Sequence, residues 1–161
     1  MKKGVLLIAV LIMVALLAGA VVWDCVGLAE DAQHRVSLAD EEIAKHERRL
    51  MKLLESSPQV SPEVEATVAA YRGANSLEAK RAAYDDVVAN FRRTMAGSVD
   101  ATNPLDRKFM DDVAGAINRR EVAEKPYEEE LAAYEAFMNT WRGGVARWFL
   151  PADGAAVKAE E

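Results

Sequence analysis

The chain contains little of the material from which catalytic and metal sites are built. Cys25 is the single cysteine among 161 residues, which excludes an intramolecular disulfide. His34 and His46 are the two histidines, and the serines gather in turns and helix caps with no histidine expected beside them. The sequence therefore predicts no enzymatic activity, no catalytic residue and no cofactor.

Both histidines follow a glutamate by four residues, in the pairs Glu30/His34 and Glu42/His46. Two such side chains share one helix face and can offer two ligands to a metal ion. The second pair follows the first by twelve residues, which is about 18 Å along a helix and about 120° around it. The pairs cannot form one site, so we expect no metal ligand. Periplasmic metal binding is the lesser functional alternative.

Basic residues are also scarce. Lys2 and Lys3 account for two of the 20 basic residues, so the rest of the chain carries 18 against 26 acidic residues. An acidic body without a basic stripe repels phosphate backbones. We therefore expect no nucleic-acid partner, and no small-molecule substrate is evident.

One long apolar run lies near the N-terminus. The segment from Gly4 to Val22 has no charged residue, and as a helix it covers about 28 Å, close to the thickness of a bilayer core. Two lysines precede it, and Trp23 follows it as interfacial aromatics do. The positive-inside bias predicts a cytoplasmic N-terminus and an extracytoplasmic remainder. The expected anchor residues are Gly4, Leu7, Leu11, Leu16, Val22 and Trp23.

A cleaved signal peptide is the alternative, because Ala18-Gly19-Ala20 fits the small-x-small pattern of a cleavage site. The apolar run continues beyond this point, so we favour an uncleaved single-pass anchor. The expected location is the bacterial inner membrane, or an internal membrane compartment continuous with it. Cys25 lies where a lipid-modified cysteine would lie, but the residues before it are too large for lipoprotein processing.

Beyond the anchor, the pattern predicts helices and no strand. We expect an all-α fold, in which the transmembrane helix is followed by an elongated antiparallel bundle of three long helices, or of four, with narrow coiled-coil-like contacts. The expected divisions are 1–23 for the anchor, 24–150 for the bundle and 151–161 for a disordered acidic tail. Apolar stripes with 4-3 spacing comprise Ala32, Val36, Ala39, Ile43, His46, Leu50 and Leu53; Val64, Val68 and Tyr71; Leu77, Arg81, Tyr84, Val88, Phe91 and Met95; and Phe109, Val113, Ile117, Arg120, Glu124, Tyr127, Leu131, Tyr134, Met138 and Trp141.

Several residues predict where these helices begin. Ser61 and Pro62 are suited to the cap and the first position of a helix. Asn75 and Glu78 have the spacing of a capping box, and Asn103 precedes a proline that opens the last helix.

The last helix has two unusual features. Arg120 and Glu124 interrupt its apolar stripe four residues apart and can pair. Pro126 removes one backbone donor and should kink the helix, and Gly143-Gly144 should end it.

The same stretch carries an ordered series of residues that resembles the C-terminal signature of LemA-family proteins. The matching positions are Phe109 to Val113, Asn118-Arg119, Val122-Ala123, Tyr127, Leu131, Tyr134, Met138, Trp141 and Gly143. The stretch from Glu65 to Tyr71 is similar to the second helix of the family, and the paired lysines before a single anchor agree with it.

The chain departs from the family pattern at several positions. Ile117 and Glu124 replace a glutamate and an arginine, Glu128 and Glu135 replace two asparagines, and Arg142 replaces a proline. The segment between residues 93 and 103 is too short for the additional middle helix of the family. The resemblance implies a divergent, shortened member with an anchored, extracytoplasmic helical domain and no enzymatic activity. Some relatives are magnetosome-associated.

An aromatic cluster follows the paired glycines near the C-terminus. It contains Trp148 and Phe149 beside Arg147, with Trp141 just before the glycines. These side chains can fold back onto the bundle end, dock a partner or contact lipid. Because Arg142 and Arg147 are the only basic residues nearby in an acidic chain, the sequence makes lipid weaker than a protein partner.

These features favour a membrane-anchored helical adaptor or scaffold of the bacterial envelope, which acts through protein–protein interaction. The expected partners are the lipid bilayer, through the anchor, and either a second copy of the chain or another envelope protein. The alternative is a membrane-remodelling or compartment-organising component, by analogy with magnetosome-associated relatives.

Overall fold

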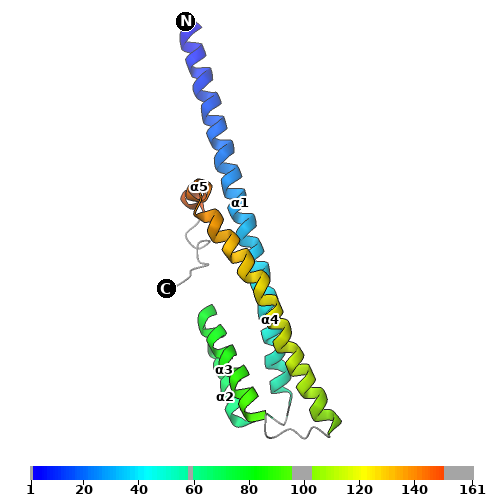
Figure 1. Ribbon diagram of the computed structural model, residues 1–161. Coiled ribbons are helices and arrows are strands. Elements are labelled where there is room, and N and C mark those ends of the chain that lie inside the picture. Colours follow the sequence, from blue (N-terminus) through cyan, green and yellow to red (C-terminus); the bar gives the residue numbers. More distant parts are fainter. Residues whose placement is uncertain (1, 58–59, 96–102, 151–161) are drawn as a thin grey trace. The chain divides into compact units, whose positions relative to one another are not determined.

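The computed structural model describes residues 2–57, 60–95 and 103–150. Within these residues the chain is all-helical and has five α-helices, labelled in Figure 1. They are α1 (Lys2–Glu55), α2 (Pro62–Gly73), α3 (Leu77–Met95), α4 (Pro104–Met138) and α5 (Trp141–Phe149). The all-α prediction is confirmed. The burial of Gly4 and Met95, the loop expected after Met95 and the tail 151–161 lie outside the described residues.

The apolar run forms the first part of α1, which continues without a break to Glu55. In the described part of the chain, this is the one helix long and apolar enough to cross a membrane, with a mean hydropathy of 2.5 and none of that window buried. Leu7, Leu11 and Leu16 are at least 60% exposed, and Trp23 is 83% exposed. A membrane anchor and a signal sequence both have these properties.

Local capping explains where the later helices begin. Ser61 caps α2 by accepting a hydrogen bond from the Val64 N–H at 3.4 Å, as predicted. Asn103 accepts from the Leu105 N–H at 3.0 Å at the start of α4. At α3 the cap is Ser76, which accepts from the Ala79 N–H at 3.1 Å, and not Asn75. The helix begins one residue later than the Asn75 capping box requires.

The C-terminal end of α4 also differs from the expectation. The helix continues through Pro126 and ends at Met138, before the paired glycines. Thr140 then caps a separate helix, α5, by accepting a hydrogen bond from the Gly143 N–H at 3.2 Å. Gly143 and Gly144 therefore lie inside α5 rather than ending α4, because the hydroxyl at Thr140 starts a new helix just before them.

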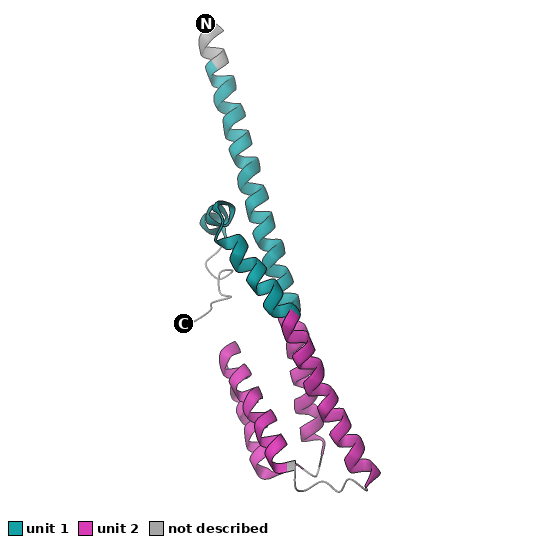
Figure 2. Cartoon of the chain, in the orientation of Figure 1, with its two compact units in different colours: residues 1–39, 126–161 teal, residues 40–125 magenta. Residues whose placement is uncertain are grey.

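The chain divides into two compact units, coloured separately in Figure 2. Unit 1 comprises Met1–Ala39 and Pro126–Glu161, and unit 2 comprises Asp40–Lys125. In unit 1, Arg35 Nε lies 3.0 Å from Glu130 Oε2, so α1 and α4 run side by side there. The buried residues of this unit include Cys25, Val36, Tyr127, Tyr134 and Met138.

Unit 2 contains the hydrophobic core formed by four helical segments. The core comprises Leu50, Met51 and Leu54 of α1, Val60 before α2, Val64, Val68 and Tyr71 of α2, Tyr84, Val87, Val88 and Phe91 of α3, and Val113, Ala116 and Ile117 of α4. Most of these residues belong to the predicted stripes. Burial of one such large aliphatic side chain contributes roughly 1.5–3 kcal/mol.

Candidate functional site

A buried polar cluster crosses the core of unit 2. It comprises Glu47, Tyr71, Tyr84 and Arg120, which come from α1, α2, α3 and α4. The Tyr71 hydroxyl donates to Glu47 Oε2 at 2.9 Å, and Arg120 Nε lies 3.5 Å from Glu47 Oε1. The Arg120 guanidinium lies 4.9 Å from the centre of the Tyr84 ring. Side chains from four helices therefore meet at one charge pair.

Arg120 also reaches Glu124, as the i,i+4 spacing predicts. Arg120 Nη1 donates to Glu124 Oε2 at 2.6 Å. The Arg120 and Glu47 side chains are 8% and 6% exposed. Burial raises the pKa of the Glu47 carboxyl above its ordinary value, against the opposing effects of the Tyr71 hydrogen bond and the positive charge of Arg120.

The two tyrosines of the cluster remain protonated. Burial, followed by the negative charge of Glu47, raises the pKa of Tyr71. Burial also raises the pKa of Tyr84, although the nearby Arg120 acts in the opposite direction. Tyr71 is therefore a permanent hydrogen-bond donor to Glu47, and the cluster is suited to holding helices in register rather than to moving protons.

A groove lies between α3 and α4 on the outside of this core. A pocket of about 370 Å³ forms one end, and an adjoining pocket of about 230 Å³ shares Arg92, Ile117 and Glu121 with it. We call the two together the α3/α4 groove. Its lining comprises Tyr84, Asp85, Val88, Ala89, Phe91, Arg92, Met110, Ala114, Ile117, Asn118, Arg120 and Glu121.

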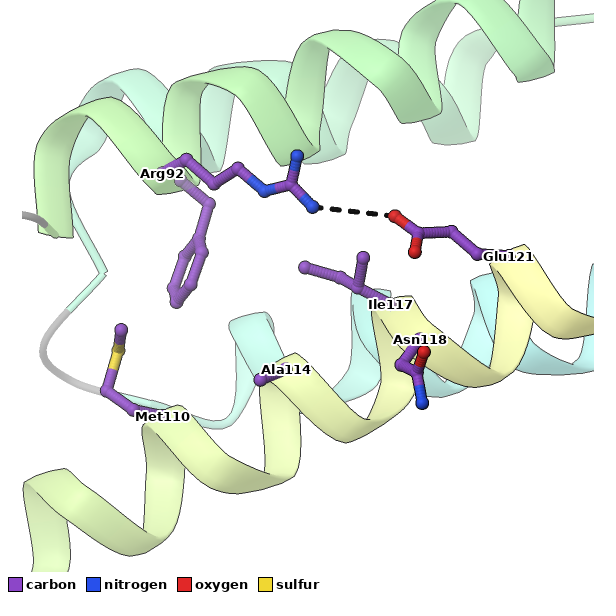
Figure 3. Close-up of a pocket in the computed structure, with 7 residues that line it drawn as sticks. Arg92, Met110, Ala114, Ile117, Asn118 and Glu121 are labelled. Atoms are coloured by element: carbon purple, nitrogen blue, oxygen red, sulfur yellow. Dashed lines mark hydrogen bonds and ion pairs between the residues drawn. The ribbon is translucent and has the colours of Figure 1, made fainter.

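Figure 3 shows the first pocket, with apolar side chains on its floor and charged groups at its rim. Phe91 and Ile117 are buried, whereas Ala114 is exposed and carries too little volume to fill the space. Arg92 Nη2 lies 3.5 Å from Glu121 Oε1 across the groove, and both side chains are more than half exposed. A solvent-exposed pair of this kind is weak, so a ligand can displace it at little cost.

The described residues hold no group of three or more His, Cys, Asp and Glu side chains placed to bind a metal ion. The predicted Glu42/His46 pair is in contact: Glu42 Oε1 lies 3.2 Å from His46 Nε2 and 3.0 Å from Lys45 Nζ, and the His46 side chain is 14% exposed. The hydrogen bond from Lys45 lowers the pKa of the Glu42 carboxyl. Glu30 and His34 are exposed on unit 1.

The predicted docking residues lie on α5, in unit 1. Trp141, Trp148 and Phe149 are 65%, 87% and 60% exposed, and Arg147 is also exposed. The aromatic side chains do not fold back into the core, because the small residues Gly143 and Ala146 form the buried side of α5.

Sequence reasoning missed Glu47 and the α3/α4 groove. Glu47 could have been found, because it lies four residues after Ile43 and three before Leu50, which both belong to the predicted stripe, and so shares their helix face. The groove has no such signal, since the alanines in its lining resemble those elsewhere on the helices.

Searches of protein-family models, curated proteins and solved structures find no match to this chain.

Proposed function

We propose that this protein is a membrane-anchored helical adaptor of the bacterial envelope, which binds a partner protein in the α3/α4 groove. The observation that carries the proposal is an open, largely apolar groove in a chain that also has an exposed apolar span. The action is binding rather than catalysis. In this proposal the helices form an elongated antiparallel bundle, and the LemA resemblance described above supports an anchored helical domain.

Anchoring is supported by the continuity of α1. The helix passes through Ala18-Gly19-Ala20 without interruption, and Cys25 and Ala29 just beyond it are fully buried. An uncleaved span with Lys2 and Lys3 before it would keep the N-terminus in the cytoplasm and the residues after Trp23 outside the inner membrane.

The groove is suited to an amphipathic helix of another envelope protein. From Met110 to Glu121, α4 covers about 16 Å, the length of three helical turns. Ala89 and Ala114 are exposed and small, so a helix backbone can approach closely. The exposed lining residues include two acidic side chains, Asp85 and Glu121, and one basic side chain, Arg92. Arg120 also lines the groove but is buried and paired with Glu47 and Glu124. The fitting occupant therefore has an apolar stripe flanked by lysine or arginine.

The test is site-specific photocrosslinking of the full-length chain in cells that express it natively. A photoreactive residue at position 118 replaces Asn118, which lines the groove and is exposed. The expected product joins position 118 to a basic amphipathic segment of another protein. Ala114→Arg should lower its yield at least about tenfold, equivalent to about 1.4 kcal/mol of binding free energy.

The matched control is Ala133→Arg, at an exposed position of α4 outside the groove, which should leave the yield unchanged. Circular dichroism of both variants checks that the fold is kept. Equal yields from Ala114→Arg and Ala133→Arg would contradict docking in the groove. Crosslinks only between copies of this chain would replace the adaptor by a homo-oligomeric scaffold.

A membrane-organising component is the second candidate. It is supported by the exposed aromatic side chains of α5 and by the analogy with magnetosome-associated relatives. Deletion of the gene, followed by electron cryotomography of the envelope, should reveal altered membranes if this candidate is correct.

A further inference from the structure

The two faces of α5 have opposite character. With 100° between successive residues, Trp141, Trp148 and Phe149 fall within an arc of about 100°, and all three are exposed. Gly143 and Ala146 lie on the opposite side of the helix and are buried. The helix thus packs through its smallest side chains and presents its largest ones outward, which is the pattern of an interfacial helix.

The small face of α5 is turned toward the end of α4. A Cβ atom added at Gly143 would overlap the backbone of Met138, the last residue of α4. Figure 1 shows α5 across this end, viewed nearly along its own axis while α1 and α4 are viewed from the side. The aromatic face therefore points away from α4, in the direction in which α4 runs.

That direction is the direction of the apolar span. Arg35 and Glu130 are in contact and the two helices are antiparallel in unit 1, so each step toward the start of α1 matches a step toward the end of α4. Eight residues beyond this contact, about 12 Å, α4 ends at Met138, level with Gly27 and about 6 Å short of Trp23. Helix α5, which begins three residues after Met138, thus lies about one helical turn from the level of Trp23, where the charge-free run ends.

We propose that α5 is a second membrane contact, which lies in the membrane–water interface beside the point where α1 leaves the bilayer. Its ligand is the lipid surface. Trp141, Trp148 and Phe149 enter the boundary between headgroups and acyl chains. Arg142 borders this face and Arg147 lies farther around the helix; both are exposed, and their long side chains reach the lipid phosphates. The inference rests on the proposed anchoring by α1 and is independent of what binds the α3/α4 groove.

Continuity with the exposed span favours lipid over a protein partner. Because α1 already holds the chain in the membrane, α5 meets the lipid surface at a high effective concentration. Even a small apolar face is then enough for α5 to bind that surface. The net acidity of the chain, which disfavours lipid in the sequence alone, matters little here. The two cations lie on the helix that touches the surface, and distant charges are screened beyond about 10 Å.

Tryptophan quenching by brominated lipids tests this inference on the full-length chain. The protein contains three tryptophans, so double Trp→Phe variants give three single-tryptophan proteins that report Trp23, Trp141 or Trp148 separately. Each is reconstituted into vesicles of phosphatidylethanolamine and phosphatidylglycerol that carry bromines near the headgroup or near the acyl chain end. A tryptophan-free protein with Glu128→Trp is the control, at an exposed position that the same register places opposite Ser37, about 21 Å along α1 from Trp23.

The expected result is strong quenching of Trp141 and Trp148, comparable with that of Trp23 and greatest for bromines near the headgroup, with the control unquenched. Quenching of Trp23 while Trp141 and Trp148 resemble the control would overturn the role of α5 and leave the anchor intact. If Trp23 is also unquenched, the anchoring itself is wrong and both ideas fail. Quenching of Trp148 that is greatest at the acyl chain end would overturn the interfacial position.

Discussion

Replacement of Arg120 by methionine removes the positive charge of the buried polar cluster while keeping most of the side-chain volume. Glu47 would remain beneath the surface without its ion-pair partner, although the hydrogen bond from Tyr71 at 2.9 Å would persist. Loss of one partner of a buried pair typically costs 3–5 kcal/mol. Because Tyr71 still solvates Glu47, we expect the low end, about 3 kcal/mol of unfolding free energy.

Two further variants separate the buried charge from general effects of arginine. Arg92→Met removes one side of the exposed pair with Glu121, and we expect a loss of about 0–1 kcal/mol. Glu47→Leu combined with Arg120→Met replaces the buried pair by apolar groups, and should recover most of the loss in Arg120→Met. Glu47→Leu alone completes a double-mutant cycle that isolates the interaction between the two charged residues.

The assay is urea unfolding of the full-length chain in a mild non-ionic detergent, followed by far-ultraviolet circular dichroism. Hydrogen exchange of α2 and α3 peptides gives a local measure from unit 2. Arg120→Met should lower both measures by about 3 kcal/mol. If Arg120→Met and Arg92→Met lose the same stability, the Arg120 charge is not buried as described and the reasoning from its burial is refuted.

Three other outcomes follow from single residues. Gly143→Ala should destabilise the packing of α5 by about 1–3 kcal/mol, because the added methyl group overlaps the end of α4. Gly144→Ala adds a methyl group that meets no atom within 4 Å and should stabilise α5 slightly. Hydrogen exchange of the α5 backbone amides measures both effects. Leu50→Ala, at a position 1% exposed, should cost about 2–5 kcal/mol in urea unfolding, and Leu38→Ala, at one 50% exposed, less than about 0.5 kcal/mol. The folded pKa of Glu47 lies above its ordinary 4.5, so the folded state binds this proton more tightly than the unfolded state. Protonation of Glu47 should therefore add to stability as pH falls from the folded pKa to 4.5, and this contribution should be lost as pH rises. The unfolding free energy should change with pH in this range, Glu47→Gln should abolish that part of the slope, and identical slopes would contradict the shifted pKa.

The helical class, the apolar span and most buried positions follow from the amino-acid pattern alone. These are local properties, because side chains three and four residues apart share one helix face whatever lies opposite. Ser61 as a cap and the Arg120–Glu124 pair were predictable for the same reason: both interactions join residues within one helical turn or so.

Which helix faces meet depends on long-range packing. The contact of Arg120 with Glu47 joins residues far apart in the chain, and no periodicity reveals such a pairing. The α3/α4 groove arises from the fit between two helices, since a small side chain such as Ala114 leaves space only where its neighbour fails to fill it.

The end of the last helix was also decided by close packing. Paired glycines usually predict a helix end, but here Thr140 caps a new helix and Gly143 permits it to approach the backbone of Met138. The sequence thus determined that aromatic residues follow the glycines. Their exposure on one side of α5 depends on the packing of Gly143 against the end of α4, and the distance of α5 from the apolar span depends on the contact between α1 and α4.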